Sequence, residues 1–173
     1  MKPIAGKNIN EEIEIASLTK IMTCYLCIMV CIKYEIDIYN HQARVSDRAA
    51  ETPGTTAELQ TGDVLTIYEL LMGLMLPSGN DASVVIAEVM GKIIQRHKKK
   101  ETKKTHYETF IAHMNLLSKE LKLDQKWSNS SGLSINPNFS TPQSIAILTS
   151  IAIRNPLFNK IVNTKQHDVE IRN

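Results

Sequence analysis

A serine and a lysine stand three residues apart near the start of the chain, in the stretch EIASLTKIMT (residues 14–23). On a helix, Ser17 and Lys20 would lie one turn apart, so the amine could reach the hydroxyl. A serine becomes a good nucleophile when a base takes its proton, and a desolvated lysine can be neutral enough to serve. Such a pair could form a nucleophile and its base, but a helix-capping serine beside a solvated lysine has the same spacing and is more common. The pair alone therefore does not indicate catalysis, and a second signal is required.

A second polar group follows in the stretch MLPSGNDA (residues 75–82). Ser78 and Asn80 offer a hydroxyl and an amide on a short turn between two apolar segments, and Gly79 permits an unusual backbone there. Residues of these types also suit an ordinary turn. The presence of both motifs, in this order and separated by a helical region, favours the catalytic interpretation.

Three blocks of the sequence resemble successive blocks of a known family: ASLTKIMT, LQTGDVLTIYELLMGLMLPSGNDASVVIAE and SKELKLDQKWSNSSGL. The family is the serine D-alanyl-D-alanine carboxypeptidases, the low-molecular-mass penicillin-binding proteins, which are related to the class A β-lactamases. The resemblance implies that Ser17 is the nucleophile and Lys20 its general base. It also implies that Ser78 relays a proton to the leaving amine and that Asn80 holds the substrate amide. The implied ligands are D-alanyl-D-alanine peptides or β-lactams.

The family's third motif, K-T-G on an edge strand, does not occur in these 173 residues, because Thr164-Lys165-Gln166 lacks the glycine. That strand supplies the anchor for the substrate carboxylate and one donor of the oxyanion hole. The loss of one such donor lowers the rate about 10²- to 10³-fold. We therefore expect a truncated, mainly α domain, the helical part of an α/β transpeptidase or β-lactamase-like fold with most of the sheet missing. For the same reason, only a weak depression of the Lys20 pKa is expected.

Two functions stay open at this stage. The chain is either an acyl-serine carboxypeptidase whose sheet is supplied from elsewhere, or a catalytically inactive homologue that serves as a structural or interaction subunit. A helical layer without its sheet would expose an apolar face, so a protein partner that covers this face is expected.

The polar groups need helices to position them, and the pattern is mostly helical. Thr66 and Glu69 have capping-box spacing at the start of a helix through residue 76. Asp81 is expected to cap a helix through residue 94, a third helix covers residues 107–121, and Thr141 with Pro142 begins a last clear helix. Strand signal is limited to DVLTI (residues 63–67) and the terminal DVEI (residues 168–171).

The amino-acid composition limits the number of domains and the classes of binding partner. A chain of 173 residues with 43% hydrophobic content can bury one core, so we expect a single domain over residues 1–173. Six of the 20 basic residues lie within residues 96–104, which places a basic surface loop at 96–106. The remainder is slightly acidic, which argues against nucleic-acid binding.

The cysteines at positions 24, 27 and 31 follow one side of the first helix and are expected to pack in the core, which favours a reducing compartment. The N-terminus lacks the apolar stretch of a secretion signal, whereas the resembled family acts outside the cytoplasmic membrane, so localisation stays open. Residues 21–32 are too short to span a bilayer. No metal site and no cofactor are expected.

Overall fold

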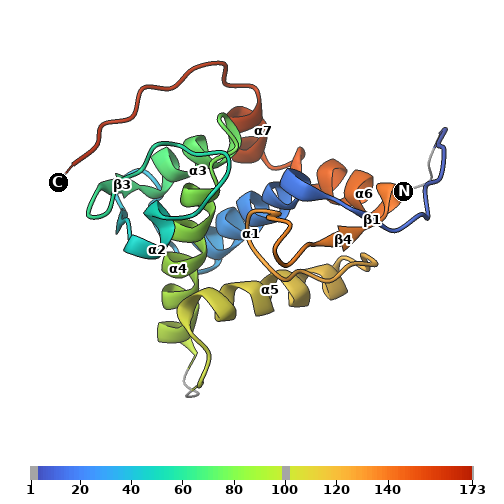
Figure 1. Cartoon of the computed structure of the whole chain (residues 1–173), viewed down its shortest axis with the longest axis horizontal. Coiled ribbons are helices and arrows are strands. Elements are labelled where there is room, and N and C mark those ends of the chain that lie inside the picture. Colours follow the sequence, from blue (N-terminus) through green and yellow to red (C-terminus); the bar gives the residue numbers. More distant parts are fainter. Residues whose placement is uncertain (1–3, 99–101, 173) are drawn as a thin grey trace.

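Helix α1 (Thr19–Lys33) lies at the centre of the computed structural model, which describes residues 4–98 and 102–172 (Figure 1). Five further helices contact it: α3 (Ile67–Met75), α4 (Asn80–His97), α5 (His106–Glu120), α6 (Pro142–Ala152) and α7 (Pro156–Val162). The short helix α2 (Asp47–Ala50) packs on α4. The mainly helical fold class expected from the sequence is confirmed.

Two small sheets complete the fold. Strand β1 (Ile13–Glu14) pairs antiparallel with β4 (Phe139–Ser140), and β2 (Gln42–Arg44) pairs antiparallel with β3 (Val64–Thr66). The DVLTI prediction is confirmed by β3. The prediction for residues 168–171 is wrong, because these residues form no strand and the C-terminal segment contributes only a single bridge between Val64 and Arg172.

The core explains why α1 is so apolar. Most of its side chains are buried, including all three cysteines, which are free. The expected core packing of the cysteines is therefore confirmed. Residues 16–33 are long and apolar enough to cross a membrane by length and composition, but 61% of this window is buried within the protein. Such burial is typical of the core helix of a globular domain.

Side-chain caps begin two of the three helices for which the sequence predicted a cap. The capping box of Thr66 and Glu69 begins α3, and Thr141 caps α6 with Pro142 in its first turn. One prediction is wrong: α4 begins at Asn80 with Gly79 as its N-cap, because the Asp81 carboxylate is used by another segment. Helix α7 was also missed: α6 ends at Ala152, and Asn155 then caps α7, with Pro156 in its first turn.

The basic segment lies between α4 and α5. Helix α4 continues to His97 and α5 begins at His106, with Thr105 and Glu108 forming a second capping box. The two ends of the predicted loop, residues 96–106, are thus helical. Residues 99–101, at its centre, lie outside the described residues.

Candidate active site

Ser17 lies in a 3-10 turn, η1 (Ala16–Leu18), which leads directly into α1. The residue before it, Ala16, has φ of 42°, a left-handed conformation that an alanine adopts at an energetic cost. The Ser17 side chain is exposed. The hydroxyl is therefore presented to solvent from a strained turn at the start of the core helix.

Lys20 is buried, with 2% of its surface exposed, one turn further along. Its Nζ donates to Ser17 Oγ at 3.1 Å and to Asn80 Oδ1 at 2.7 Å. A third contact runs to the backbone carbonyl of Ser131 at 3.0 Å. The structure thus brings together three of the four predicted site residues around one amine.

The hydrogen-bonding chemistry of these three partners determines how a neutral Lys20 amine must orient its N–H groups and its lone pair. The amide oxygen of Asn80 and the carbonyl of Ser131 can only accept hydrogen bonds, so each needs an N–H of Lys20. A neutral amine has two N–H groups and one lone pair. When both N–H groups are used in this way, the lone pair is left for the hydroxyl proton of Ser17, which is the geometry of a general base.

The pKa of Lys20 is lowered to about 8 from its usual 10.5. Desolvation by burial is the main cause, and the charge of Asp81 opposes it by raising the pKa. Only a weak depression was expected, on the argument that a sheet was needed to bury the amine. The lowering is larger because Asn80 and the segment containing Ser131 provide the burial instead.

Two hydrogen bonds to the loop before α3 hold Asn80. Its side-chain nitrogen donates to the carbonyl of Pro53 at 2.7 Å, and its backbone N–H donates to the carbonyl of Thr55 at 2.7 Å. Because the nitrogen is engaged by a carbonyl, the side-chain oxygen must face Lys20. The amide orientation is therefore determined by its neighbours.

Ser78 occupies the turn between α3 and α4, with φ of 62°. Its backbone carbonyl accepts a hydrogen bond from the Thr55 hydroxyl at 2.6 Å. In the described part of the chain, its own hydroxyl makes no hydrogen bond. Backbone strain of this kind at a polar residue is common at functional sites.

Asp81 anchors the loop that supports Asn80. Its carboxylate, 1% exposed, accepts hydrogen bonds from the Thr56 hydroxyl at 2.7 Å and from the backbone N–H groups of Ala57 and Leu59 at 3.0–3.1 Å. This use of the carboxylate explains why Asp81 does not cap α4. This role could not be predicted from the sequence, since the donors are mostly backbone groups.

The loop containing NSSGL (residues 129–133), the end of the third resembling block, contacts α1 directly. Ser130 and Ser131 present consecutive carbonyls to Thr23, at 2.7 Å, and to Lys20. At Gly132, φ is 90°, and a Cβ atom would stand 1.8 Å from the carbonyl oxygen of Ala16. Only glycine allows this approach. Sequence reasoning missed the role because the contacts depend on the path of the backbone.

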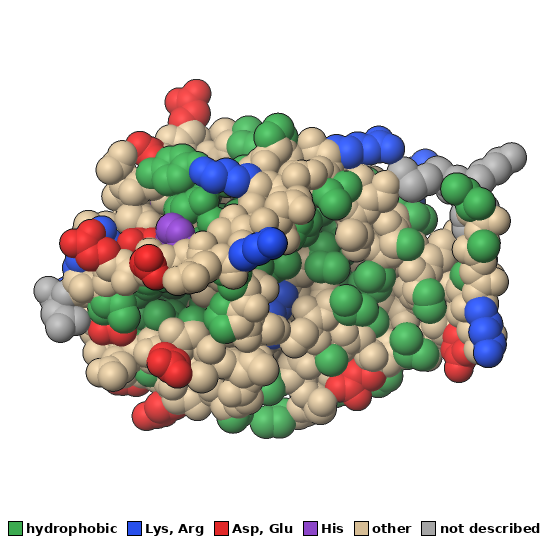
Figure 2. Space-filling model, turned by 90° about the horizontal axis from the view of Figure 1, so that it is seen from above, with side chains coloured by type: hydrophobic (Ala, Val, Ile, Leu, Met, Phe, Trp, Pro, Cys, Tyr) green, Lys and Arg blue, Asp and Glu red, His purple; other side chains and the backbone are tan. Residues whose placement is uncertain are grey.

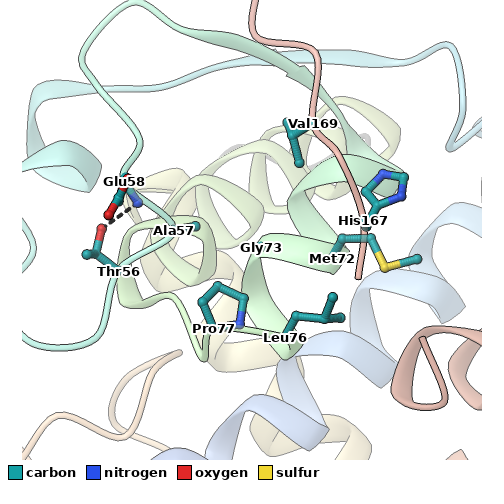
Figure 3. A pocket seen from close by; sticks show the side chains of 9 residues that line it. All are labelled: Thr56, Ala57, Glu58, Met72, Gly73, Leu76, Pro77, His167 and Val169. Carbon is teal, nitrogen blue, oxygen red and sulfur yellow. Dashed lines mark hydrogen bonds between the residues drawn. The ribbon is translucent and has the colours of Figure 1, made fainter. Parts of the chain in front are cut away.

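A cavity of about 270 Å³ lies beside the Ser78 turn (Figure 3). Its lining comes from the loop before α3, from α3 itself and from the C-terminal segment: Thr56, Ala57, Glu58, Met72, Gly73, Leu76, Pro77, His167 and Val169. In Figure 3, His167 and Val169 lie on the C-terminal segment, across the cavity from the loop carrying Thr56. The cavity does not include the side chains that surround the Lys20 amine.

Within residues 4–98 and 102–172, no group of three or more His, Cys, Asp or Glu side chains is placed to hold a metal ion. The functional groups gathered at the site are a hydroxyl, an amine, an amide and backbone carbonyls. Such a set suits proton transfer and nucleophilic attack.

Comparison with known proteins identifies the family. The peptidase S11 family, described as D-alanyl-D-alanine carboxypeptidase, matches residues 2–173. The chain belongs to this family. Among curated S11 relatives, it is 31% identical over 164 residues to the D-alanyl-D-alanine carboxypeptidase DacF of Bacillus subtilis, and 31% identical over 153 residues to a D-alanyl-D-alanine carboxypeptidase of Streptomyces. These matches cover 94% and 87% of this chain.

Solved structures of a D-alanyl-D-alanine carboxypeptidase and of a DD-transpeptidase share the fold. The carboxypeptidase DacD of Francisella tularensis superposes with a TM-score of 0.76 at 28% identity, over 90% of this chain and 35% of that one. A mutant of the Streptomyces K15 DD-transpeptidase superposes with a TM-score of 0.75 at 26% identity, over 91% of this chain and 58% of that one. The chain spans 39% and 50% of the two curated relatives. It therefore corresponds to only part of the length of these relatives.

Proposed function

We propose that this chain carries the nucleophile and the general base of a serine D-alanyl-D-alanine carboxypeptidase. The observation that supports this most is the Lys20 amine, which lies 3.1 Å from Ser17 Oγ and 2.7 Å from Asn80 Oδ1 and has a pKa lowered to about 8. A fraction of the amine is then neutral near pH 7, as a base for a serine requires.

The proposed reaction proceeds by two acyl transfers. Neutral Lys20 takes the Ser17 proton while Oγ attacks the carbonyl carbon of the terminal peptide bond. The proton passes through Ser78 to the amine of the leaving D-alanine, and an ester forms on Ser17. Water then hydrolyses the ester, which releases the shortened peptide and restores the hydroxyl. Asn80, already oriented by its neighbours, holds the substrate amide. A β-lactam would acylate Ser17 in the same way.

The test is covalent labelling by a fluorescent penicillin, with the labelled peptide identified by mass spectrometry. We expect labelling confined to Ser17 and lost in Ser17→Ala and Lys20→Met. Because K-T-G is absent from these 173 residues, we expect this polypeptide alone to release D-alanine poorly or not at all. Robust release that Ser17→Ala abolishes would contradict this expectation, and labelling retained in Ser17→Ala would contradict the proposed nucleophile.

The second candidate is a catalytically inactive homologue that acts as an interaction subunit. Exposed apolar side chains favour it, since Ile13, Leu18 and Phe139 near the N-terminal part of the site are each more than 40% exposed. Large apolar side chains of this kind can mark a surface that another protein covers. If penicillin never labels Ser17, in the chain alone or with added polypeptide, this candidate replaces the first.

A further inference from the structure

Two consecutive carbonyl groups of the loop after α5 fix the position of α1 at the site. The hydroxyl of Thr23 donates to the carbonyl of Ser130 at 2.7 Å, and Lys20 donates to that of Ser131 at 3.0 Å. Only the backbone dihedral angles of Ser130 and Ser131 separate the Ser130 N–H from the Ser131 carbonyl, so whatever holds Ser130 limits where that carbonyl can lie. The groups that hold Ser130 are therefore relevant to the Lys20 amine.

Tyr107, in the first turn of α5, holds Ser130. The backbone N–H of Ser130 donates to the Tyr107 hydroxyl at 3.1 Å, and the two hydroxyl oxygens are 3.3 Å apart. Ser130 is fully buried. A buried N–H needs a partner, and here that partner is the side chain of a residue 23 positions earlier, at the far end of α5.

The Ser130 hydroxyl also donates to the Tyr107 hydroxyl, so Tyr107 accepts two hydrogen bonds from this one residue. On its other side, Ser130 Oγ lies 3.1 Å from Ser83 Oγ, and the Ser83 hydroxyl donates to the carbonyl of Asn80 at 2.7 Å. The Ser130 side chain is therefore held between Tyr107 and the first turn of α4.

Arg48, from α2, covers the tyrosine ring. Its guanidinium carbon lies 3.9 Å from the ring centroid of Tyr107, which is a close cation–π contact. The Arg48 side chain itself is exposed. The tyrosine is therefore fixed at its ring by one helix and at its hydroxyl by the loop.

We propose that Tyr107 is a positioning residue for the Ser17 and Lys20 pair. It holds Ser130 in the orientation in which the next carbonyl, that of Ser131, accepts a hydrogen bond from Lys20 and closes the amine off from water. The inference rests on the proposed function in that Lys20 is taken as the base. Its test measures Lys20 directly and does not require turnover.

The experiment titrates Lys20 by NMR of its side-chain ¹³Cε and ¹⁵Nζ nuclei, assigned with Lys20→Met. Tyr107→Phe keeps the ring under Arg48 but loses both hydrogen bonds to Ser130. We expect the midpoint of the Lys20 titration to rise by about one pH unit, because water reaches the amine once the loop relaxes. Arg48→Gln should move the midpoint in the same direction by a smaller amount.

Ser118→Ala is the matched control. Ser118 also lies on α5 and accepts a buried hydrogen bond from the Trp127 indole at 2.6 Å, so its loss destabilises the same region without touching Ser130. We expect the Lys20 midpoint to stay unchanged in this variant. An unchanged midpoint in Tyr107→Phe, or an equal shift in Ser118→Ala, would overturn the proposal.

Two other outcomes, a variant that does not fold and a chain that penicillin does not label, can be told apart from a failure of this proposal. If Tyr107→Phe does not fold, Arg48→Gln decides the question by the same readout. If penicillin never labels Ser17, the proposed function fails, while the Lys20 titration still reports whether Tyr107 positions the amine.

Discussion

Lys20 is the residue whose ionisation links the site to stability. Its pKa is lowered from 10.5 to about 8 in the folded chain, mainly by desolvation. Between these pH values the unfolded state binds more protons than the folded state, so the free energy of unfolding rises with pH. From pH 8 to 10.5, we expect the wild-type chain to gain stability relative to Lys20→Met. The gain in the free energy of unfolding should be on the order of 1–3 kcal/mol.

Urea unfolding at several pH values measures this difference. Lys119→Met, at an exposed position on α5, serves as the control for removing a lysine. Parallel pH profiles for the wild-type chain and Lys20→Met would show that the amine is not desolvated in the folded state.

Gly132 permits the closest backbone approach at the site. Gly132→Ala would place a methyl group against the carbonyl of Ala16 at φ of 90°, so we expect a loss of roughly 2–4 kcal/mol from strain and overlap together. Gly62→Ala is the control, since its φ of 95° is similar but its nearest contact is the flexible Arg44 side chain at 3.7 Å. It should lose about 1–2 kcal/mol. Equal losses in urea unfolding would argue against the Ala16 contact.

At the level of helices, the two capping boxes differ in burial. Thr66 and Glu69 are both buried, and Glu69 also pairs with Arg172 at 3.2 Å, whereas the box of Thr105 is exposed. Thr66→Ala should lower the unfolding free energy by about 1–2 kcal/mol, and Thr105→Ala by about 0.5–1 kcal/mol. Chemical unfolding of both variants measures this, and a larger loss for Thr105→Ala would contradict the ranking.

A helix could be predicted correctly where a capping residue stands directly before a run of apolar residues at helical spacing. Thr66 and Thr141 marked helix starts correctly because their hydroxyls act within three residues along the chain. Asp81 misled the prediction because its carboxylate binds backbone groups more than 20 residues away. The candidate site divides in the same way. The proximity of Ser17 and Lys20 was predictable because it follows from their spacing on one helix, whereas the contact with Ser131 depends on the fold.

The whole molecule exposes apolar side chains that a closed domain would cover. Figure 2 shows hydrophobic side chains between polar ones over one face. Over the described chain as a whole, the large exposed apolar residues include Ile32, Leu116, Ile135 and Ile153. Each square ångström of apolar surface removed from water contributes about 25 cal/mol. We therefore expect the purified chain to self-associate or to bind a partner. Sedimentation at several concentrations tests this, and a stable monomer throughout would contradict it.

The reactivity of the three cysteines can report how often α1 opens. Their thiols are buried, and burial raises the pKa of Cys24 far above its usual value, so almost no thiolate forms in the folded chain. An alkylating reagent can then modify Cys24 only during the moments when α1 leaves the core. The rate of alkylation in native buffer therefore measures how often the helix that carries Lys20 opens, without any probe having to be introduced.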